Sequence, residues 1–186
     1  MSSSGNFWKM LSRTSRLVRL TVRDNVGFGL AMKKVPKPLR EARVNELLER
    51  VRLSKFAGHR PHQLSGGMKQ RVAIARALVE SPEFIMMDEP FAALDALTRI
   101  RFDEQLPDLV GGAAILFVTH DVGEALLVAD RVLVLSRGGG ISLEADGLRG
   151  TRQEQRRAML MSPAGAIRQA QLYDALRTAA PVAHDA

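Results

Sequence analysis

The chain contains no cysteine. This absence excludes disulfide bonds, thiolate metal sites and cysteine nucleophiles, and it agrees with a reducing compartment, so the cytoplasm is the expected location. Long apolar runs are missing as well. The longest, residues 110–118, has about half of the roughly 20 residues that a membrane-spanning helix needs. The sequence therefore predicts no transmembrane segment.

Acidic residues are scarce at the start of the chain. Residues 1–40 hold nine lysines and arginines and one acid, Asp24, whereas the remainder holds 18 bases and 19 acids. The net charge of +7 therefore belongs to the N-terminal segment. A basic surface suits nucleic acid or an anionic membrane. A basic tail on a body of balanced charge is weak support for the first, so no nucleic-acid partner is expected.

The first 20 residues form a basic leader with two interpretations. Serines alternate with arginines, and Trp8, Leu11 and Val18 fall on an irregular helical stripe. One interpretation is a membrane-surface helix or a targeting peptide. The other is an unstructured or non-native leader, which the poor periodicity favours.

The rest of the chain alternates between helical and strand patterns. Apolar spacing predicts helices over 39–53 and 68–78, with a loop over 58–65 between them. Short apolar runs predict strands over 84–87, 114–118 and 132–135, and helices are expected over 94–106 and 122–129. A glycine turn at 138–140 precedes a helical stretch over 153–176 with a break near Ser162-Pro163. This alternation predicts an α/β domain with a parallel sheet and right-handed crossovers.

A serine and two glycines open the helix that begins near Met68. Ser65, Gly66 and Gly67 leave backbone N–H groups at the positive end of the helix dipole, which suits a phosphate oxygen. An ordinary N-cap with a flexible turn is the alternative.

The surrounding sequence resembles a known family. Residues 64–78, LSGGMKQRVAIARAL, resemble the signature motif of the ATP-binding cassette (ABC) transporter ATPases, and Pro61-His62-Gln63 resembles the approach to that motif. The resemblance implies that Ser65, Gly66 and Gly67 bind the γ-phosphate of an ATP held mainly by the opposite subunit of a dimer. Gln70 is placed with them among the cofactor-binding residues.

Two acids close the first predicted strand. An aspartate that emerges at the carboxyl end of a buried strand, as Asp88 does, can hold Mg²⁺ through its water shell. A solvated pair of charges or a helix cap is the alternative for Asp88 and Glu89. FIMMDEP resembles Walker B, which implies that Glu89 orients or deprotonates the attacking water.

Two further motifs follow. Ala93-Leu94-Asp95 resembles the D-loop, although Asp95 can also serve as an N-cap, and the two roles are compatible. His120 stands where the family has its H-loop histidine, which implies a contact with the γ-phosphate. A histidine after a strand can also be a capped surface residue.

The stretch TVRDNVGFGL, residues 21–30, resembles the entry to the helical subdomain of importers for nitrate, sulfonates and taurine. This resemblance implies a permease partner whose coupling helix docks on the subdomain, a second ATPase subunit, a solute-binding protein that acts through the permease, and a location on the inner face of the cell membrane. The implied fold is a partial P-loop NTPase fold, a parallel sheet flanked by helices, with an N-terminal helical subdomain.

The family pattern is incomplete. No Gly-x-x-x-x-Gly-Lys-Ser/Thr loop occurs, the first glutamine is Gln63, and the sequence therefore lacks the Walker A cradle and the Q-loop glutamine ahead of Thr21. An N-terminally truncated member is expected. The missing strands would leave the edge of the Walker B strand unpaired.

The expected organisation is a non-family leader over 1–20, a helical signature subdomain over 21–80, the rest of the ATPase core over 81–150 and a helical extension over 151–186. The expected function is ATP hydrolysis, with ATP and Mg²⁺ as cofactors, that drives solute import. The alternatives are a module that cannot hydrolyse ATP but binds a permease or partner ATPase, and a non-functional remnant.

Overall fold

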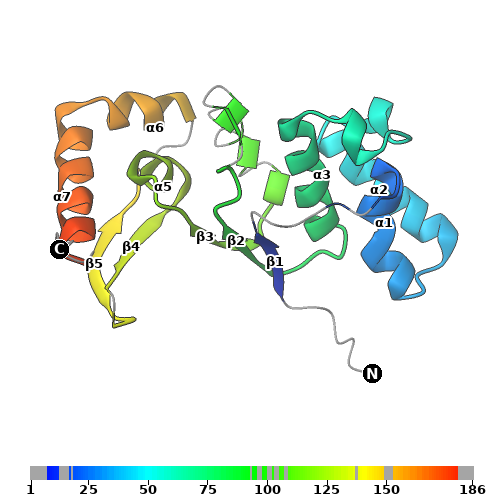
Figure 1. The fold of residues 1–186 in the computed structure, drawn as a ribbon, viewed down its shortest axis with the longest axis horizontal. Coiled ribbons are helices and arrows are strands. Elements are labelled where there is room, and N and C mark those ends of the chain that lie inside the picture. Colours follow the sequence, from blue (N-terminus) through cyan, green and yellow to red (C-terminus); the bar gives the residue numbers. More distant parts are fainter. Residues whose placement is uncertain are drawn as a thin grey trace, which may run out of the picture. The chain divides into compact units, whose positions relative to one another are not determined.

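The computed structural model describes residues 8–12, 17, 19–92, 94–95, 98–99, 102, 105–106, 109–136, 138–148 and 153–179. The chain forms two compact units, residues 1–118 and 119–186 (Figure 1). In the described part of the chain, no helix combines the length and apolarity needed to cross a bilayer.

Three helices make up the helical part of the first unit: α1 (Val22–Met32), α2 (Lys37–Arg50) and α3 (Gly66–Leu78). Short 3₁₀ turns at Ser54–Phe56 and Pro61–Gln63 connect α2 to α3. Buried apolar side chains lie at spacings of three and four on the inner faces of these helices (Val22 and Val26 on α1; Val44, Leu47 and Leu48 on α2; Val72, Ala75 and Leu78 on α3). The helices expected over 39–53 and 68–78 are therefore confirmed, with each start two residues earlier and the end of the first three residues earlier.

The start of α1 is fixed by polar contacts. The Thr21 hydroxyl accepts a hydrogen bond from the Asp24 amide and caps the helix. Asn25 is completely buried, and its side-chain amide donates to the carbonyls of Leu20 and Thr21. Because buried polar groups must be paired, Asn25 ties the segment before α1 to its first turn.

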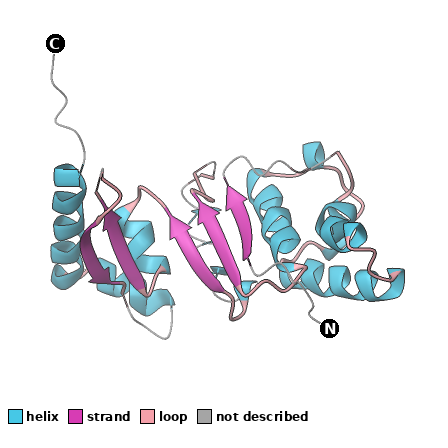
Figure 2. Cartoon of the chain, turned by 90° about the horizontal axis from the view of Figure 1, so that it is seen from below, coloured by secondary structure: helices cyan, strands magenta, loops and turns pink. Residues whose placement is uncertain are grey.

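A three-stranded parallel sheet completes the first unit (Figure 2). Its strands are β1 (Trp8–Ser12), β2 (Phe84–Asp88) and β3 (Ala114–Val118), in the order β1-β2-β3. Leu11 on β1 and Ile85 and Met87 on β2 are buried on the same side of the sheet. The parallel α/β class, with a helical subdomain before β2, agrees with the expected fold.

The pairing of β1 corrects two expectations. Trp8 and Leu11 were expected in an unstructured leader or on a helical stripe, but residues 8–12 form a strand in register with β2. The edge of β2 was expected to be unpaired, yet β1 and β3 pair with its two sides. The pairing partner lies more than 70 residues away in sequence, so local periodicity could not reveal it. Val18 lies outside the described residues.

The second unit is built on an antiparallel hairpin. Its elements are α5 (Val122–Val128), β4 (Arg131–Leu135), β5 (Ile141–Asp146), α6 (Gln153–Leu160) and α7 (Pro163–Ala179). The buried core of this unit draws on α5, the hairpin, the residue Leu148 just after it, and α7 (Val122, Leu126, Val132, Val134, Leu148 and Leu172). The break at Ser162-Pro163 and the glycine turn at 138–140 are confirmed.

The role of β4 was predicted incorrectly. Residues 132–135 were expected in the parallel sheet, but β4 pairs antiparallel with β5, a strand that was not predicted. The tight turn after Ser136 favours an antiparallel neighbour because parallel neighbours need a long crossover. Of the helix expected over 94–106, Thr98, Arg99, Phe102, Gln105 and Leu106 are helical, and the remaining positions after Asp95 lie outside the described residues.

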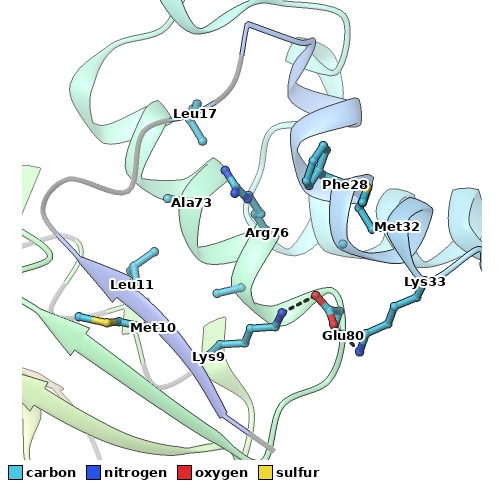
Figure 3. A pocket seen from close by; sticks show the side chains of 12 residues that line it. Lys9, Met10, Leu11, Leu17, Phe28, Met32, Lys33, Ala73, Arg76 and Glu80 are labelled. Atoms are coloured by element: carbon cyan, nitrogen blue, oxygen red, sulfur yellow. Dashed lines mark hydrogen bonds and ion pairs between the residues drawn. The ribbon is translucent and has the colours of Figure 1, made fainter. Parts of the chain in front are cut away.

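A buried carboxylate joins the sheet to the helices. The Glu80 side chain is 4% exposed; its Oε1 lies 2.5 Å from the Lys9 Nζ on β1, and its Oε2 lies 2.5 Å from the Lys33 Nζ at the end of α1 (Figure 3). Gly29 makes room, because a Cβ there would lie 2.2 Å from Glu80 Oε1. Burial alone would raise the pKa of Glu80, but the hydrogen bonds and charges of Lys33 and Lys9 outweigh it and hold the pKa below its ordinary value.

Glu80→Gln is expected to destabilise the first unit at neutral pH by about 1.5–3 kcal/mol, because charge-assisted hydrogen bonds are lost. A carboxyl whose pKa is lowered on folding stabilises the folded state above its unfolded pKa, and this contribution is lost as pH falls through the lowered folded value. The difference between wild type and variant in urea unfolding should therefore shrink below roughly pH 4.

Glu46→Gln is the control, since Glu46 is 55% exposed in its pair with Arg43. It should change stability little at any pH. A wild-type advantage over Glu80→Gln that stays constant from pH 7 to pH 3 would contradict the ion-pair account.

Candidate functional site

The signature residues occupy the beginning of α3. Ser65 is the N-cap, with an extended backbone (φ −65°, ψ 164°), and its hydroxyl accepts a hydrogen bond from the Met68 amide. Ser65 and Gly66 are exposed, while Gly67 and Gln70 are half-buried. The first-turn amides of α3 therefore lie next to an exposed serine, as a site for a phosphate oxygen requires.

The two glycines bring this helix end against the segment after β2. A Cβ on Gly67 would lie 2.9 Å from Thr98 Cγ2 and 3.5 Å from Phe102 Cε2, whereas a Cβ on Gly66 would lie 3.7 Å from Leu94 Cδ2. The close approach at Gly67 is possible because glycine has no Cβ. The signature and the D-loop-like segment are thus packed together within the first unit.

The two acids lie at the carboxyl end of β2. Asp88 is the last residue of the strand, and both Asp88 and Glu89 are half-buried. Glu89 has a φ of 42°, which is unusual for a residue with a side chain. Its amide donates to the Val118 carbonyl at the end of β3, 2.9 Å away. The backbone at Glu89 is therefore held in a strained conformation by the neighbouring strand.

Asp95 caps the helical turn that follows. Its Oδ1 accepts a hydrogen bond from the Thr98 amide, and its backbone carbonyl accepts one from the Arg99 amide. The sequence-based expectation of an N-cap at Asp95 is confirmed. Ala93, the first residue of the D-loop-like motif, lies outside the described residues.

His120 belongs to the second unit and is exposed. It stands between Thr119 and Asp121, immediately before α5. The Asp121 side chain caps α5 by accepting from the Glu124 amide. The Asp121 amide donates to the Thr119 hydroxyl, so both neighbours of His120 are held by hydrogen bonds.

The chemistry available in the first unit is that of oxygen donors and backbone amides. Among the described residues, no group of three or more His, Cys, Asp or Glu side chains could hold a metal ion by itself. Asp88 and Glu89 nevertheless offer the carboxylate oxygens that Mg²⁺ prefers, and Mg²⁺ commonly takes one or two carboxylates together with water and phosphate. The donor set therefore fits a magnesium ion that arrives with a nucleotide.

Sequence reasoning missed several residues that support this site. Phe102 packs against Phe91, and the Arg71 guanidinium lies 5.5 Å from the Phe102 ring centroid. Arg71 also donates to the Val51 carbonyl and the Gln105 side chain. Arg71 lies in the signature motif, four residues after Gly67. This i, i+4 spacing could have indicated that Arg71 and Gly67 share the inner face of α3.

The chain matches one family model and is similar to several curated proteins. The family model for ABC transporters matches residues 3–92, a range that contains β1, the signature and the paired acids. The spermidine/putrescine import ATP-binding protein of Hahella chejuensis is 52% identical over 121 residues, which are 64% of this chain and 33% of the relative. The match to the family model places residues 3–92 in the ABC transporter family.

Two importer subunits are similar to this chain at comparable identity. A nitrate import ATP-binding protein of Synechocystis is 48% identical over 128 residues, 67% of this chain and 19% of the relative. A sulfate/thiosulfate import ATP-binding protein of Mycobacterium bovis is 52% identical over 122 residues, 64% of this chain and 34% of the relative. The chain thus spans about a fifth to about a third of the length of these relatives.

The strain at Glu89 predicts an inverted preference between glycine and alanine. Both Glu89→Gly and Glu89→Ala remove the carboxylate, but only glycine adopts a positive φ without steric cost, so the glycine variant should be more stable by about 1–2 kcal/mol. Glu83 precedes β2, where φ is not positive, and there alanine should be favoured by about 0.4–1 kcal/mol. Urea unfolding of the four variants measures both differences, and the same preference at both positions would argue against strain.

The contact at Gly67 predicts different outcomes for neighbouring glycines. Gly67→Ala should cost about 1–3 kcal/mol of stability because its methyl group overlaps Thr98. Gly66→Ala has room and should be neutral or stabilising by up to about 1 kcal/mol. Thr98→Ser removes the opposing methyl group and should relieve most of the Gly67→Ala cost, as thermal unfolding of the single and double variants would show. Equal costs with and without Thr98→Ser would mean that the two residues do not oppose each other.

Proposed function

We propose that this chain is part of the ATP-binding subunit of an importer, in which ATP binding and hydrolysis drive the passage of a solute through a membrane permease. The observation that carries the proposal is the packing of the signature helix end, through Gly66 and Gly67, against Leu94 and Thr98 after the paired acids. This contact fixes the position of the N-terminus of α3 relative to the segment after β2. The family resemblance implies a dimer in which each nucleotide lies between two subunits.

The proposed roles follow from position and chemistry. Asp88 would hold Mg²⁺ through its carboxylate and bound water. Glu89 would orient the attacking water or take up its proton. The exposed amides and hydroxyl at Ser65, Gly66 and Gly67 would donate to the γ-phosphate of an ATP bound mainly by the partner subunit, with Gln70 beside them on the same helix.

Two further residues have proposed roles. Asp95, fixed as a cap, would place the D-loop beside the partner subunit's nucleotide site. His120 would donate to the γ-phosphate from its exposed position before α5. Mg²⁺ would contribute charge neutralisation at the β- and γ-phosphates. The Gly-x-x-x-x-Gly-Lys-Ser/Thr pattern does not occur among the 186 residues, so other residues must supply the phosphate cradle.

The permease partner is proposed to dock on the helical part of residues 21–80. A groove of about 520 Å³ lies between α1, α3 and β1, with Phe28, Met32 and Arg76 on its wall and Glu80 at its end (Figure 3). Its mixture of apolar and charged side chains suits an amphipathic helix. Docking there would place the chain at the inner face of the cell membrane, with a solute-binding protein acting through the permease.

The solute class is proposed to be nitrate-, sulfonate- or taurine-like.

A second candidate is a module that serves a partner's nucleotide without hydrolysing ATP itself. The missing phosphate-cradle pattern favours this alternative, because positioning supplies most of the catalysis in phosphoryl transfer. Such a chain would still present Ser65, Gly66 and Gly67 to an ATP bound elsewhere.

Two variants separate these candidates. The full chain would be mixed with a complete ATP-binding subunit, such as the spermidine/putrescine relative from Hahella chejuensis, and turnover of ATP with Mg²⁺ would be measured. If the chain hydrolyses ATP, Glu89→Gln should lower the turnover that the chain adds by about 10²-fold or more, while Glu83→Gln leaves it unchanged.

A serving module should depend on Ser65 but not on Glu89, whereas a chain that hydrolyses ATP should depend on both. Ser65→Arg would abolish the turnover that the chain adds, and Glu89→Gln would have no effect. If the chain neither binds ATP with Mg²⁺ nor changes the turnover of the complete subunit, both candidates are wrong.

A further inference from the structure

A closed set of hydrogen bonds surrounds the backbone of His120. The Thr119 hydroxyl accepts from the Asp121 amide, 3.0 Å away, and donates to the Glu124 carboxylate Oε2. The Asp121 carboxylate in turn accepts from the Glu124 amide, 3.0 Å away. These three residues therefore connect the position before His120, the position after it, and the first turn of α5.

Glu124 is an unusual residue to find in this place. It is 8% exposed, and a buried carboxylate is costly unless it is paired. Asn25, a buried polar residue of the first unit, satisfies backbone carbonyls of its own helix start. Glu124 instead reaches back across His120 to a side chain that precedes the helix.

The helix that carries Glu124 is itself well anchored. Val122 and Leu126 flank Glu124 on α5 and belong to the buried core of the second unit, together with Val132, Val134 and Leu172. The backbone of Glu124 is therefore fixed by the core, and the hydrogen bond from the Thr119 hydroxyl to its carboxylate restrains Thr119. His120 remains exposed between two restrained neighbours, so its imidazole can face a ligand while its backbone is held.

We propose that Thr119 and Glu124 are positioning residues for His120. They act through the backbone on either side of the histidine and direct an exposed imidazole without touching the ligand themselves. The inference rests on the proposed function for the part that concerns ATP, but the restraint on His120 is a property of the chain alone. A misplacement of about 1 Å at a reacting group can cost about 10²-fold in rate.

The restraint is measured on the full chain, without nucleotide, by ¹⁵N relaxation. The backbone order parameter of His120 should be near 0.85 in the wild type and fall below about 0.6 in Thr119→Val and Glu124→Ala. Thr119→Ser keeps the hydroxyl and Glu124→Gln keeps an acceptor oxygen, so both should retain the wild-type value. Thr178→Val is the matched control, because the Thr178 hydroxyl bonds only to backbone carbonyls on α7 among the contacts identified for it.

A second measurement, on the wild type alone, tests the proposal even if the variants do not fold. In the wild type, the Asp121 amide should exchange slowly with solvent because it donates to the Thr119 hydroxyl. Rapid exchange of this amide in the folded wild type would overturn the proposal. So would a Thr119→Val variant with a lower melting temperature and an unchanged order parameter at His120, since that result describes a purely structural role.

Turnover of the mixed assembly tests the link to ATP. Thr119→Val should lower the turnover that the chain adds by as much as His120→Ala does, and Thr119→Ser should restore it. If His120→Ala has no effect, the proposed role of His120 in ATP hydrolysis is wrong, while the relaxation data still decide whether Thr119 and Glu124 hold it. A loss in His120→Ala without a loss in Thr119→Val would contradict the positioning role.

Discussion

The close approach of α3 to the segment after β2 is the contact on which the arrangement of the first unit's motifs depends. Gly67 faces Thr98 at a distance that leaves no room for a methyl group. Thr98 is held by the Asp95 cap, and Asp95 follows the paired acids by only a few residues. The contact between Gly67 and Thr98 thus holds the exposed N-terminus of α3, which suits a phosphate, against the segment that follows the carboxyl end of β2. Ligand sites in parallel α/β sheets form at that end of the strands.

Glu89, the residue proposed to act on the attacking water, has a backbone conformation that lowers the stability of the fold. Glu89 adopts a positive φ while its amide is bonded to the end of β3. Three other described residues with side chains, Lys34, Arg52 and Ser81, have a positive φ just after helices, where the left-handed conformation satisfies carbonyls at the helix end. Glu89 has no such explanation, because it follows a strand. Strain that the neighbouring strand maintains is typical of functional positions.

The sequence allowed the local elements and motif positions to be predicted, but not the long-range pairings. The pattern of apolar residues located α2, α3, β2, β3 and α5 to within a few residues, because helical spacing or a short apolar run marks each of them locally. The strand at Trp8–Ser12 was missed because its conformation comes from pairing with β2, and the hairpin partner of β4 was missed for the same reason. The Glu80 ion pairs were also invisible, since Lys9, Lys33 and Glu80 meet only when three elements pack together.

The most direct measurement of the central claim is photochemical crosslinking with an ATP analogue that carries its reactive group on the γ-phosphate. In a mixture of this chain with a complete ATP-binding subunit and Mg²⁺, we expect the label on the peptide that contains Ser65, Gly66 and Gly67, with unmodified ATP as competitor. Saturable labelling of the complete subunit that never reaches this peptide, while the two chains remain associated, would contradict the claim that the start of α3 is a phosphate site.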